Sequence, residues 1–266
     1  RQRSPRTVLP GPVLRAPDGR VVPVAWLPET TPSDLARFAR TAATVHARAD
    51  GAGPGTVPST RSLAVLGERH PRFDRLADRI VRIAGEPPVG AETTLGAVSA
   101  RRCTAYELTR DDLVDLLSRG PALGVYVGHG RPIGWVGYAG LRAHHLAEHT
   151  SQAHHRPAAA IVSLTCRTAS RRRTGLSFAE SLPLQGVAAA ALGAVTATVH
   201  TGNARWAVRI ARDLGAARTI GDLVCQVAPH DPHADTYRLL GDPTAPLLDA
   251  PEHESPARPH PIEEAS

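Results

Sequence analysis

Short apolar runs alternate along the chain with stretches in which apolar residues recur every three or four positions. The apolar runs predict strands at Ser62–Leu66, Gly124–Val127, Ala158–Leu164, Gly193–Val199 and Tyr237–Leu240, with Thr94–Ser99 as a weaker candidate. The periodic stretches predict helices over Ser33–Arg48 and Phe73–Ala84, from Thr109 onward, and over Ala204–Leu214. Strands that are apolar throughout are typical of a parallel sheet covered on both faces. The pattern therefore predicts an α/β domain with a roughly six-stranded, mostly parallel sheet and helices on both faces.

The two ends of the chain break this rhythm. Residues 1–60 are interrupted by many Pro and Gly residues and contain a single helical stretch. We expect an N-terminal extension with one helix, packed onto or hinged to a main domain at residues 61–248. Residues 249–266 hold Pro, His and Glu with few apolar side chains, which predicts a disordered tail.

Composition narrows the classes of partner. The chain has 42% hydrophobic but only 4% aromatic residues, so its core must be built from Ala, Val and Leu. No apolar run reaches the roughly 18 residues that a membrane span needs, so we expect no membrane partner. All 31 basic residues are Arg, and they are scattered among acidic residues without aromatics for base stacking, which argues against nucleic-acid binding. Arg in place of Lys, abundant Ala and Pro, and absent Met indicate a GC-rich, and we expect bacterial, genome.

Three widely separated cysteines, Cys103, Cys166 and Cys225, form no CxxC pair. Such a sparse, odd set argues against a disulfide framework and favours a reducing compartment. The sequence also opens without a basic segment followed by an apolar one. We therefore expect a cytoplasmic location.

Two residues with catalytic chemistry follow predicted strands directly. His129 comes after the run that ends at Val127, and Cys166 after the run that ends at Leu164. In parallel sheets, ligands bind at the carboxyl ends of the strands. A cysteine nucleophile needs a neighbouring base and backbone N–H groups for the oxyanion. Taken singly, Cys166 would also suit an inert core position and His129 a solvated loop; together they predict a Cys–His dyad.

The segments around both residues are similar to those of known peptidases. Gly124–Gly130 (GVYVGHG) and Ile161–Cys166 (IVSLTC) resemble the two strands that end in the catalytic His and Cys of the caspase-like clan of cysteine peptidases, and within it of the gingipain-like family. Ser177–Glu180, with the apolar run after it, is similar to the next helix and strand. Tyr237–Pro243 (YRLLGDP) resembles the closing motif of gingipain-like proteins. The resemblance covers roughly residues 60 to 248.

The resemblance implies a caspase-like sandwich and peptide-bond hydrolysis by a Cys–His dyad. Secreted gingipains bind calcium, but no acidic calcium loop stands out here, and we expect no cofactor. A polypeptide is then the substrate, Cys166 the nucleophile and His129 the general base and acid, with the N–H groups of Gly130 and Cys166 as the oxyanion hole. His200 and Asn203, after the Gly193–Val199 run, are predicted to contact substrate. Because that loop holds no carboxylate, a preference for basic residues like that of Arg- or Lys-cleaving relatives is in doubt.

The loop after Cys166 carries three consecutive arginines, Arg171, Arg172 and Arg173, with almost no apolar residue to anchor them. We expect a mobile, exposed loop. By analogy with caspase-like peptidases, it is predicted to be an activation loop, as a processing site or as a docking patch for an acidic protein activator or inhibitor.

Two alternatives remain open. His145, Glu148 and His149 fit the HxxEH pattern of a class of zinc peptidases on a predicted helix, although no downstream segment offers a convincing third ligand. The second alternative is a caspase-like domain kept as a binding scaffold without activity.

Overall fold

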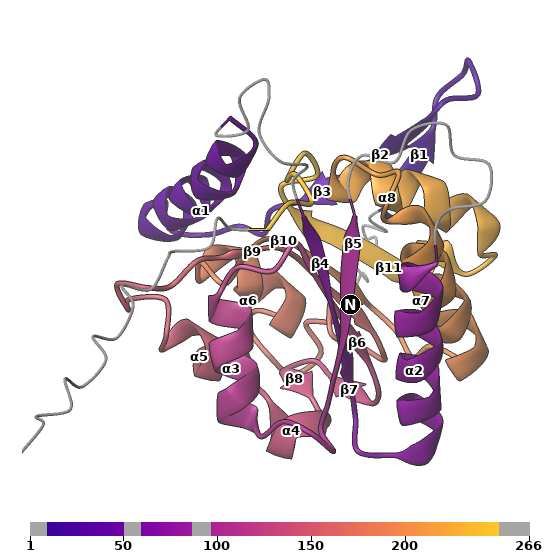
Figure 1. Cartoon of the computed structure of the whole chain (residues 1–266). Helices are drawn as coiled ribbons and strands as arrows, with labels where there is room; N and C mark the ends of the chain where they lie inside the picture. Colours follow the sequence, from indigo (N-terminus) through magenta and orange to yellow (C-terminus); the bar gives the residue numbers. More distant parts are fainter. Residues whose placement is uncertain (1–9, 51–59, 87–96, 250–266) are drawn as a thin grey trace, which may run out of the picture.

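A computed structural model of the chain describes residues 10–50, 60–86 and 97–249 (Figure 1). Its centre is a seven-stranded sheet in the order β3-β11-β10-β9-β6-β4-β5. All neighbouring strands in it are parallel except β10 and β11. The strands are β3 Ala25–Trp26, β4 Arg61–Gly67, β5 Val98–Thr104, β6 Leu123–Val127, β9 Ala158–Leu164, β10 Ala188–Ala194 and β11 Tyr237–Gly241. Two small hairpins pair β1 Val13–Arg15 with β2 Val21–Pro23, and β7 Gly130–Arg131 with β8 Gly134–Trp135.

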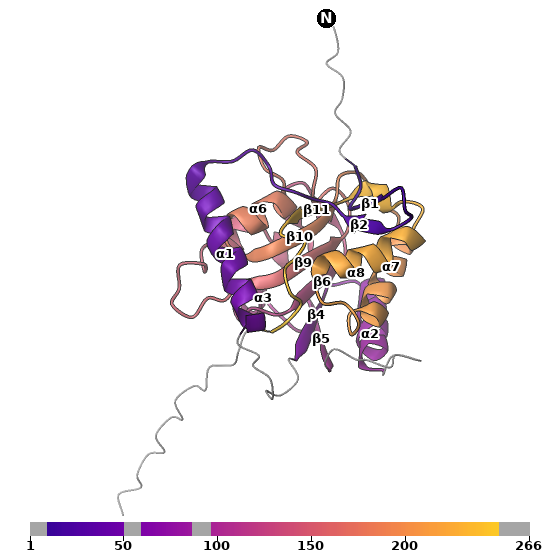
Figure 2. The same cartoon turned by 90° about the horizontal axis from the view of Figure 1, so that it is seen from above.

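Helices cover both faces of the sheet, as Figure 2 shows from above. One layer holds α2 Pro71–Gly85, α7 His200–Asp213 and α8 Ile220–Val227; the other holds α1 Pro32–Asp50, α3 Arg110–Ser118, α5 Ala143–Ala147 and α6 Phe178–Leu184. The short α4 Gly137–Gly140 follows β8, and two 3-10 turns, Ala228–His230 and Ala234–Thr236, precede β11. The predicted α/β sandwich is confirmed, with one strand more than expected.

Local sequence explains several of these elements. Every residue of β6, β9 and β10 is buried, as expected for central parallel strands with both faces covered. Helix α3 begins after Thr109, whose side chain accepts the Asp112 N–H while the Asp112 carboxylate accepts the Thr109 N–H. The same reciprocal cap starts α6 at Ser177 and Glu180. These caps satisfy N–H groups that have no partner inside the helix.

Two predicted strands were misplaced. The Gly193–Val199 strand is wrong: β10 is Ala188–Ala194, the chain then leaves the sheet, and α7 begins at His200 rather than at Ala204. Alanine has low strand propensity, so the alanine run gave no strand signal, although its small side chains suit a strand packed under α1 and α6. The Thr94–Ser99 candidate is β5, Val98–Thr104; residues 94–96 lie outside the described part of the chain. Strand β5 lies at the edge of the sheet and carries charged residues, so a search for apolar runs does not find its bounds.

The N-terminal segment contributes to the sheet itself. Strand β3 pairs in parallel with β11, with Ala25 opposite Leu239. Helix α1 packs on α6 and β10, and the Nε2 atom of His46 lies 2.7 Å from a carboxylate oxygen of Asp242. At the other end, Asp249 accepts hydrogen bonds from backbone N–H groups, whereas the rest of the predicted tail, 250–266, lies outside the described residues. Within the described ranges, no helix is both long and apolar enough to span a bilayer.

Candidate active site

The register of two central strands brings His129 and Cys166 to one end of the sheet. Strands β6 and β9 are parallel neighbours, with Val127 opposite Leu164. His129 and Cys166 each follow that pair by two residues. Because paired strands lie about 4.8 Å apart, the two residues leave the sheet side by side.

The two glycines around His129 are required by close packing. A Cβ atom on Gly130 would lie 2.6 Å from the Thr165 side chain and 2.7 Å from the Cys166 carbonyl oxygen. A Cβ atom on Gly128 would overlap the Tyr126 ring and approach the Glu68 side chain to 2.9 Å. Only glycine fits at either place, so the Gly-His-Gly motif is set by contact with β9 and with the end of β4.

His129 is oriented by Glu68, a residue that the sequence analysis missed. The Glu68 Oε2 atom lies 2.7 Å from His129 Nδ1 and accepts the His129 backbone N–H at 2.6 Å. A carboxylate can only accept, so the ring proton sits on Nδ1 and Nε2 carries the lone pair. That Nε2 lone pair accepts a hydrogen bond from the Arg72 guanidinium at 3.1 Å. A usable signal for Glu68 was present: it directly follows β4, the strand beside β6.

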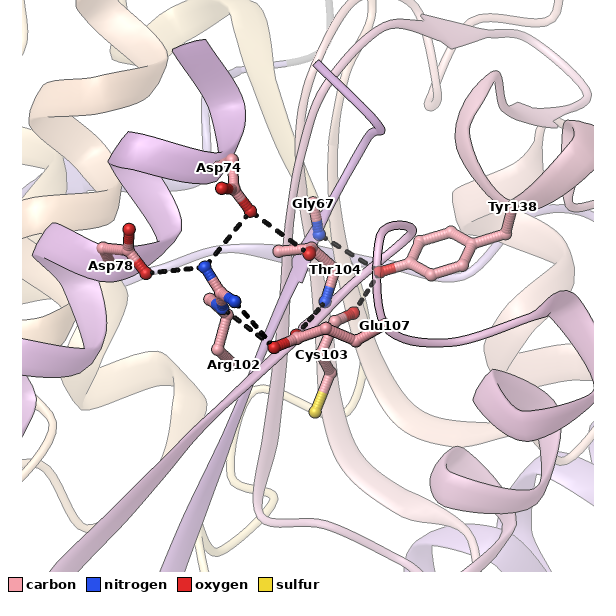
Figure 3. A network of polar contacts seen from close by, with 8 residues as sticks. All are labelled: Gly67, Asp74, Asp78, Arg102, Cys103, Thr104, Glu107 and Tyr138. Carbon is pink, nitrogen blue, oxygen red and sulfur yellow. Dashed lines mark hydrogen bonds and ion pairs between the residues drawn. The ribbon is translucent and has the colours of Figure 1, made fainter. Parts of the chain in front are cut away.

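A polar network holds the backbone next to Glu68 in place (Figure 3). The buried Tyr138 hydroxyl accepts the Gly67 N–H at 3.1 Å and donates to the Cys103 carbonyl. Burial raises the pKa of Tyr138 well above its usual range, which keeps the hydroxyl protonated. The Glu68 N–H in turn donates to the Val127 carbonyl at 3.1 Å, which ties β4 to β6.

In the same network, Arg102 on β5 fixes α2 against the sheet. Its guanidinium contacts carboxylates of Asp74 and Asp78 on α2, at 3.4 and 2.9 Å, and of Glu107 in the loop after β5, at 2.8 Å. Thr104 adds a hydroxyl bond to Asp74 at 3.3 Å. These bonds fix the helix that supplies Arg72 to the site.

Cys166 is half-buried, and its sulfur faces the loop after β10. The Thr198 N–H donates to Sγ at 3.3 Å, and the Thr198 hydroxyl lies 3.7 Å away. The Thr198 carbonyl oxygen also lies 3.7 Å from Sγ. The next residue, Arg167, has a left-handed backbone with φ of 61°, so the chain turns sharply just after the sulfur. Its N–H is held by the Thr196 carbonyl at 3.0 Å.

The other two thiols lie in different surroundings. Cys103 is buried in the core between β5 and α3, and Cys225 lies in α8. Burial raises the pKa of each thiol to about 11. Neither is poised to form a thiolate near neutral pH.

The backbone N–H groups of Gly130 and Cys166, predicted to form the oxyanion hole, differ in their surroundings from the paired N–H groups of the sheet. Within the described residues, the Cys166 N–H donates to no protein acceptor. Gly130 faces Trp135 across the β7–β8 hairpin, but Trp135 donates its N–H to Leu141 while the neighbouring Val136 bonds to His129. In an antiparallel ladder this alternation directs the Gly130 N–H away from β8. Neither N–H group therefore has an acceptor among the described residues, and their role as an oxyanion hole stays a prediction.

The two predicted substrate contacts differ in position. His200 begins α7, and the Phe73 ring packs edge-on against both His200 and His129, with centroids 5.5 and 5.3 Å apart. Burial, then Arg72 and His129, lowers the pKa of His200. Asn203 is buried, and its amide is bonded to the Thr198 hydroxyl at 3.0 Å and to Tyr237. The buried Asn203 amide therefore supports the Thr198 loop, and a contact with substrate stays a prediction.

The three-arginine loop is exposed as expected, but it is anchored, contrary to expectation. Arg171 bonds with its Nε atom to both carboxylate oxygens of Glu180, at 2.9 and 3.0 Å. Glu180 lies three residues into the cap of α6, so the cap fixes the loop as well. The loop is thus anchored by an ion pair rather than by an apolar side chain. Arg172 and Arg173 remain exposed.

The histidine motif does not form the expected helical site. Helix α5 ends at Ala147, before Glu148 and His149, and the His145 Nδ1 atom accepts the Arg142 N–H at 3.1 Å. Across the described ranges, no three His, Cys, Asp or Glu side chains gather as metal ligands. The predicted helical face with both histidines is therefore wrong.

Comparisons with known proteins agree with this architecture. A solved structure of the Arg-specific cysteine proteinase gingipain R is similar with a TM-score of 0.60 and 16% identity, over 83% of this chain and 54% of that one. The complex of pro- and mature domains of RgpB from Porphyromonas gingivalis is similar with a TM-score of 0.51 and 15% identity. The match covers 71% of this chain and 48% of that one. The structure of another protease is similar with a TM-score of 0.61 and 10% identity. The match covers 84% of this chain and 56% of that one. The chain thus spans about half the length of these proteins.

No curated protein sequence matches the chain. The sequence profile of peptidase family C25, in contrast, matches residues 77–248, which include β5, both candidate dyad residues and the closing YRLLGDP segment. The similar structures share the fold of gingipain R. The chain belongs to peptidase family C25, the gingipain family of cysteine peptidases.

Proposed function

We propose that the chain is a cysteine endopeptidase that cleaves polypeptides with Cys166 as nucleophile and His129 as general base and acid. The observation that carries this proposal is the pairing of β6 with β9, which delivers an oriented imidazole and a half-buried sulfur to the same end of the sheet. Membership of family C25 supports the reaction class.

The contacts at the site support a definite sequence of steps. The His129 Nε2 lone pair takes the Cys166 proton, and the thiolate attacks the peptide carbonyl carbon. The N–H groups of Gly130 and Cys166 bind the oxyanion. His129 then protonates the leaving amine, and a water molecule, deprotonated by the same imidazole, hydrolyses the thioester. Glu68 acts as a positioning residue because it holds Nδ1–H and stabilises the imidazolium.

Before the first step, Arg72 must leave His129. Its guanidinium bonds to the same nitrogen that accepts the thiol proton. In this arrangement Nε2 is occupied, and we infer that it is a resting arrangement. Binding of a substrate that moves the Arg72 side chain would free the base.

We also infer that the loop with Arg171, Arg172 and Arg173 is an activation loop that responds to a cut or to a protein activator or inhibitor. The Arg171–Glu180 pair supports this role, because loosening it would release the segment directly after Cys166 from α6. One similar structure is a complex between pro- and mature domains of its protein, which agrees with protein-level regulation. Replacing all three arginines by Ser tests the role. Unchanged activity, with no cut near the loop in active enzyme, would rule it out.

The central test uses single substitutions and two inhibitors. Cys166→Ala and His129→Ala should each lower cleavage of a mixed peptide library by about a thousandfold or more, because the two groups act as one unit. Circular dichroism should show an unchanged fold. Cys103→Ala and Cys225→Ala are the matched controls and should retain activity.

The same assay separates the alternatives. If a chelator abolishes cleavage while iodoacetamide spares it, the zinc peptidase with His145, Glu148 and His149 is correct and the dyad is not. If the purified chain cleaves no peptide, with or without trypsin treatment of the three-arginine loop, the non-catalytic scaffold is favoured.

A further inference from the structure

A cavity of 390 Å³ opens directly beside the candidate dyad, and its polar lining is entirely cationic. The lining residues are Arg131, Pro132, Ile133, Arg167, Arg172 and Arg173. Arg131 follows Gly130, and Arg167 follows Cys166, so both walls begin at the candidate oxyanion hole. Two of the lining residues thus directly follow Gly130 and Cys166 in the sequence.

The four guanidinium groups are not neutralised by the protein. Within the described residues, none of them lies within 4 Å of a carboxylate. Glu180 of α6 accepts from Arg171 with both carboxylate oxygens. Four like charges around one opening repel each other, and a ligand carboxylate relieves that repulsion.

The walls that carry these arginines are fixed by buried contacts. In the β7–β8 hairpin, the buried Trp135 ring stacks on Tyr126 with centroids 4.3 Å apart, and its Nε1 donates to Ser163 at 2.9 Å. The opposite wall is tied down by the Arg171–Glu180 pair and by the bond from the Ala179 N–H to the Thr168 carbonyl at 2.9 Å. A bond between the walls runs from the Phe178 N–H to the Pro132 carbonyl at 2.7 Å.

The other side of the dyad carries a further guanidinium group. Arg72 lies over the Phe73 ring at 4.5 Å, and its Nε atom is buried without a partner among the described residues. His200 packs against the same ring. The carboxylate closest to the dyad, Glu68, is occupied by His129. An arginine or lysine side chain of a substrate would find no free carboxylate in this group of residues.

We infer that the arginine-lined cavity binds an acidic side chain, Asp or Glu, of the peptide substrate within two residues of the scissile bond. The inference rests on the proposed function and deepens it by naming the substrate class. Guanidinium groups recognise carboxylates through paired, charge-assisted hydrogen bonds, and four of them can address one carboxylate from several directions. This preference is opposite in charge to that of the Arg-specific gingipain R, whose fold the chain shares.

The test compares wild-type protein with the double variant Arg131→Glu/Arg172→Glu. Cleavage sites in a proteome-derived peptide library are read by mass spectrometry, and kcat/KM is measured on matched peptides with Glu, Gln or Arg at the enriched position. We expect Asp and Glu to be enriched at one fixed position, and the double variant to lower kcat/KM for the Glu peptide at least tenfold. The Arg peptide should become the better substrate.

Arg40→Glu is the matched control, because Arg40 is an exposed arginine on α1, which packs on α6 and β10 away from the carboxyl ends of β6 and β9. It changes net charge by the same amount per site and should leave both the preference and kcat/KM unchanged. Arg131→Gln/Arg172→Gln, with an intermediate loss, guards against misfolding of the charge-reversed protein. Library cleavage without acidic preference, or with a preference that survives charge reversal, overturns the inference and leaves the peptidase proposal standing.

A binding measurement keeps the inference testable if no cleavage occurs. Fluorescein-labelled peptides rich in Glu, or in Gln at the same positions, are titrated with the Cys166→Ala protein and followed by anisotropy. Tighter binding of the Glu peptide, lost in the charge-reversed background, supports an acidic-peptide site even if the peptidase proposal fails. Equal binding of the two peptides overturns the inference.

Discussion

Arginines on the two sides of the candidate dyad lie in opposite electrostatic settings. On the α2 side, Arg102 is surrounded by three carboxylates and joins β5 to α2. On the cavity side, Arg131, Arg167 and Arg172 face an opening with no carboxylate in its lining. The contrast teaches that the same residue type serves structure where its charge is matched and remains available for a ligand where it is not.

Among the variants that compare the two sides of the dyad, the largest effect should come from Glu68, the carboxylate on the α2 side that contacts His129. Glu68→Gln keeps the shape but removes the charge that orients His129 and stabilises the imidazolium, so we expect kcat to fall about a hundredfold or more with KM little changed. Glu107→Gln, which alters the neighbouring Arg102 network without touching His129, is the control for a general electrostatic effect. A Glu68→Gln enzyme of normal kcat would show that the Glu68–His129 contact has no catalytic consequence.

Paired and unpaired arginines should differ in stability. Arg102→Gln leaves Asp74 and Asp78 without their partner, and we expect the free energy of unfolding to drop by about 1–2 kcal/mol in urea titrations. Arg172→Gln should change it by less than about 0.5 kcal/mol, since no protein carboxylate loses a partner. An equal loss of unfolding free energy in the two variants would show that Arg102 and Arg172 do not differ in their contribution to stability.

Raising the salt concentration should also separate the two groups of arginines, through a smaller change in kcat/KM. Raising NaCl from 0.05 to 0.5 M shortens the screening length, so kcat/KM for a Glu-containing peptide should fall several-fold while that for the Gln peptide stays level. The melting temperature, followed by circular dichroism, should change little over this range. A salt effect of equal size on both peptides would point to general rather than local attraction.

The smallest effect concerns the thiols away from the dyad. With a pKa raised to about 11, Cys103 and Cys225 are in the thiolate form in about one molecule in three thousand at pH 7.5, and this fraction grows only as pH rises toward 11. Iodoacetamide at pH 7.5 should therefore modify Cys166 well before the other two, as peptide mapping by mass spectrometry can show. Equal labelling of all three would contradict the contrast in their surroundings.

The alternation of buried runs was enough to predict the fold and the position of His129 and Cys166 after neighbouring parallel strands. Central strands such as β9 are apolar at every position, and parallel strands end at one edge, so the pattern carries both facts. The bounds of two strands could not be predicted, also for physical reasons. The alanines of β10 have no strand signature, and β5 is an edge strand with arginines, so the bounds of both were wrong.

Side-chain partnerships were the part that the sequence pattern could not supply. Glu68 is separated from His129 by 61 positions, and only the pairing of β4 with β6 brings them together. Arg171 appeared unanchored because its partner, Glu180, lies inside the cap of another helix. Asn203 was predicted to contact substrate because it follows the loop in sequence, and the pattern gave no sign of its partners Thr198 and Tyr237.

The edge strand β3 has a consequence for synthesis of the chain. Ala25 pairs with Leu239, so residues 214 positions apart complete the sheet together. At the usual rate of translation, about 10–40 s separate the appearance of these two residues from the ribosome. During that interval β3 has no neighbouring strand in the sheet. Once β11 has been made, it can pair with β10 on one side and with β3 on the other. The complete seven-stranded sheet around Cys166 can therefore form only after β11 has emerged from the ribosome.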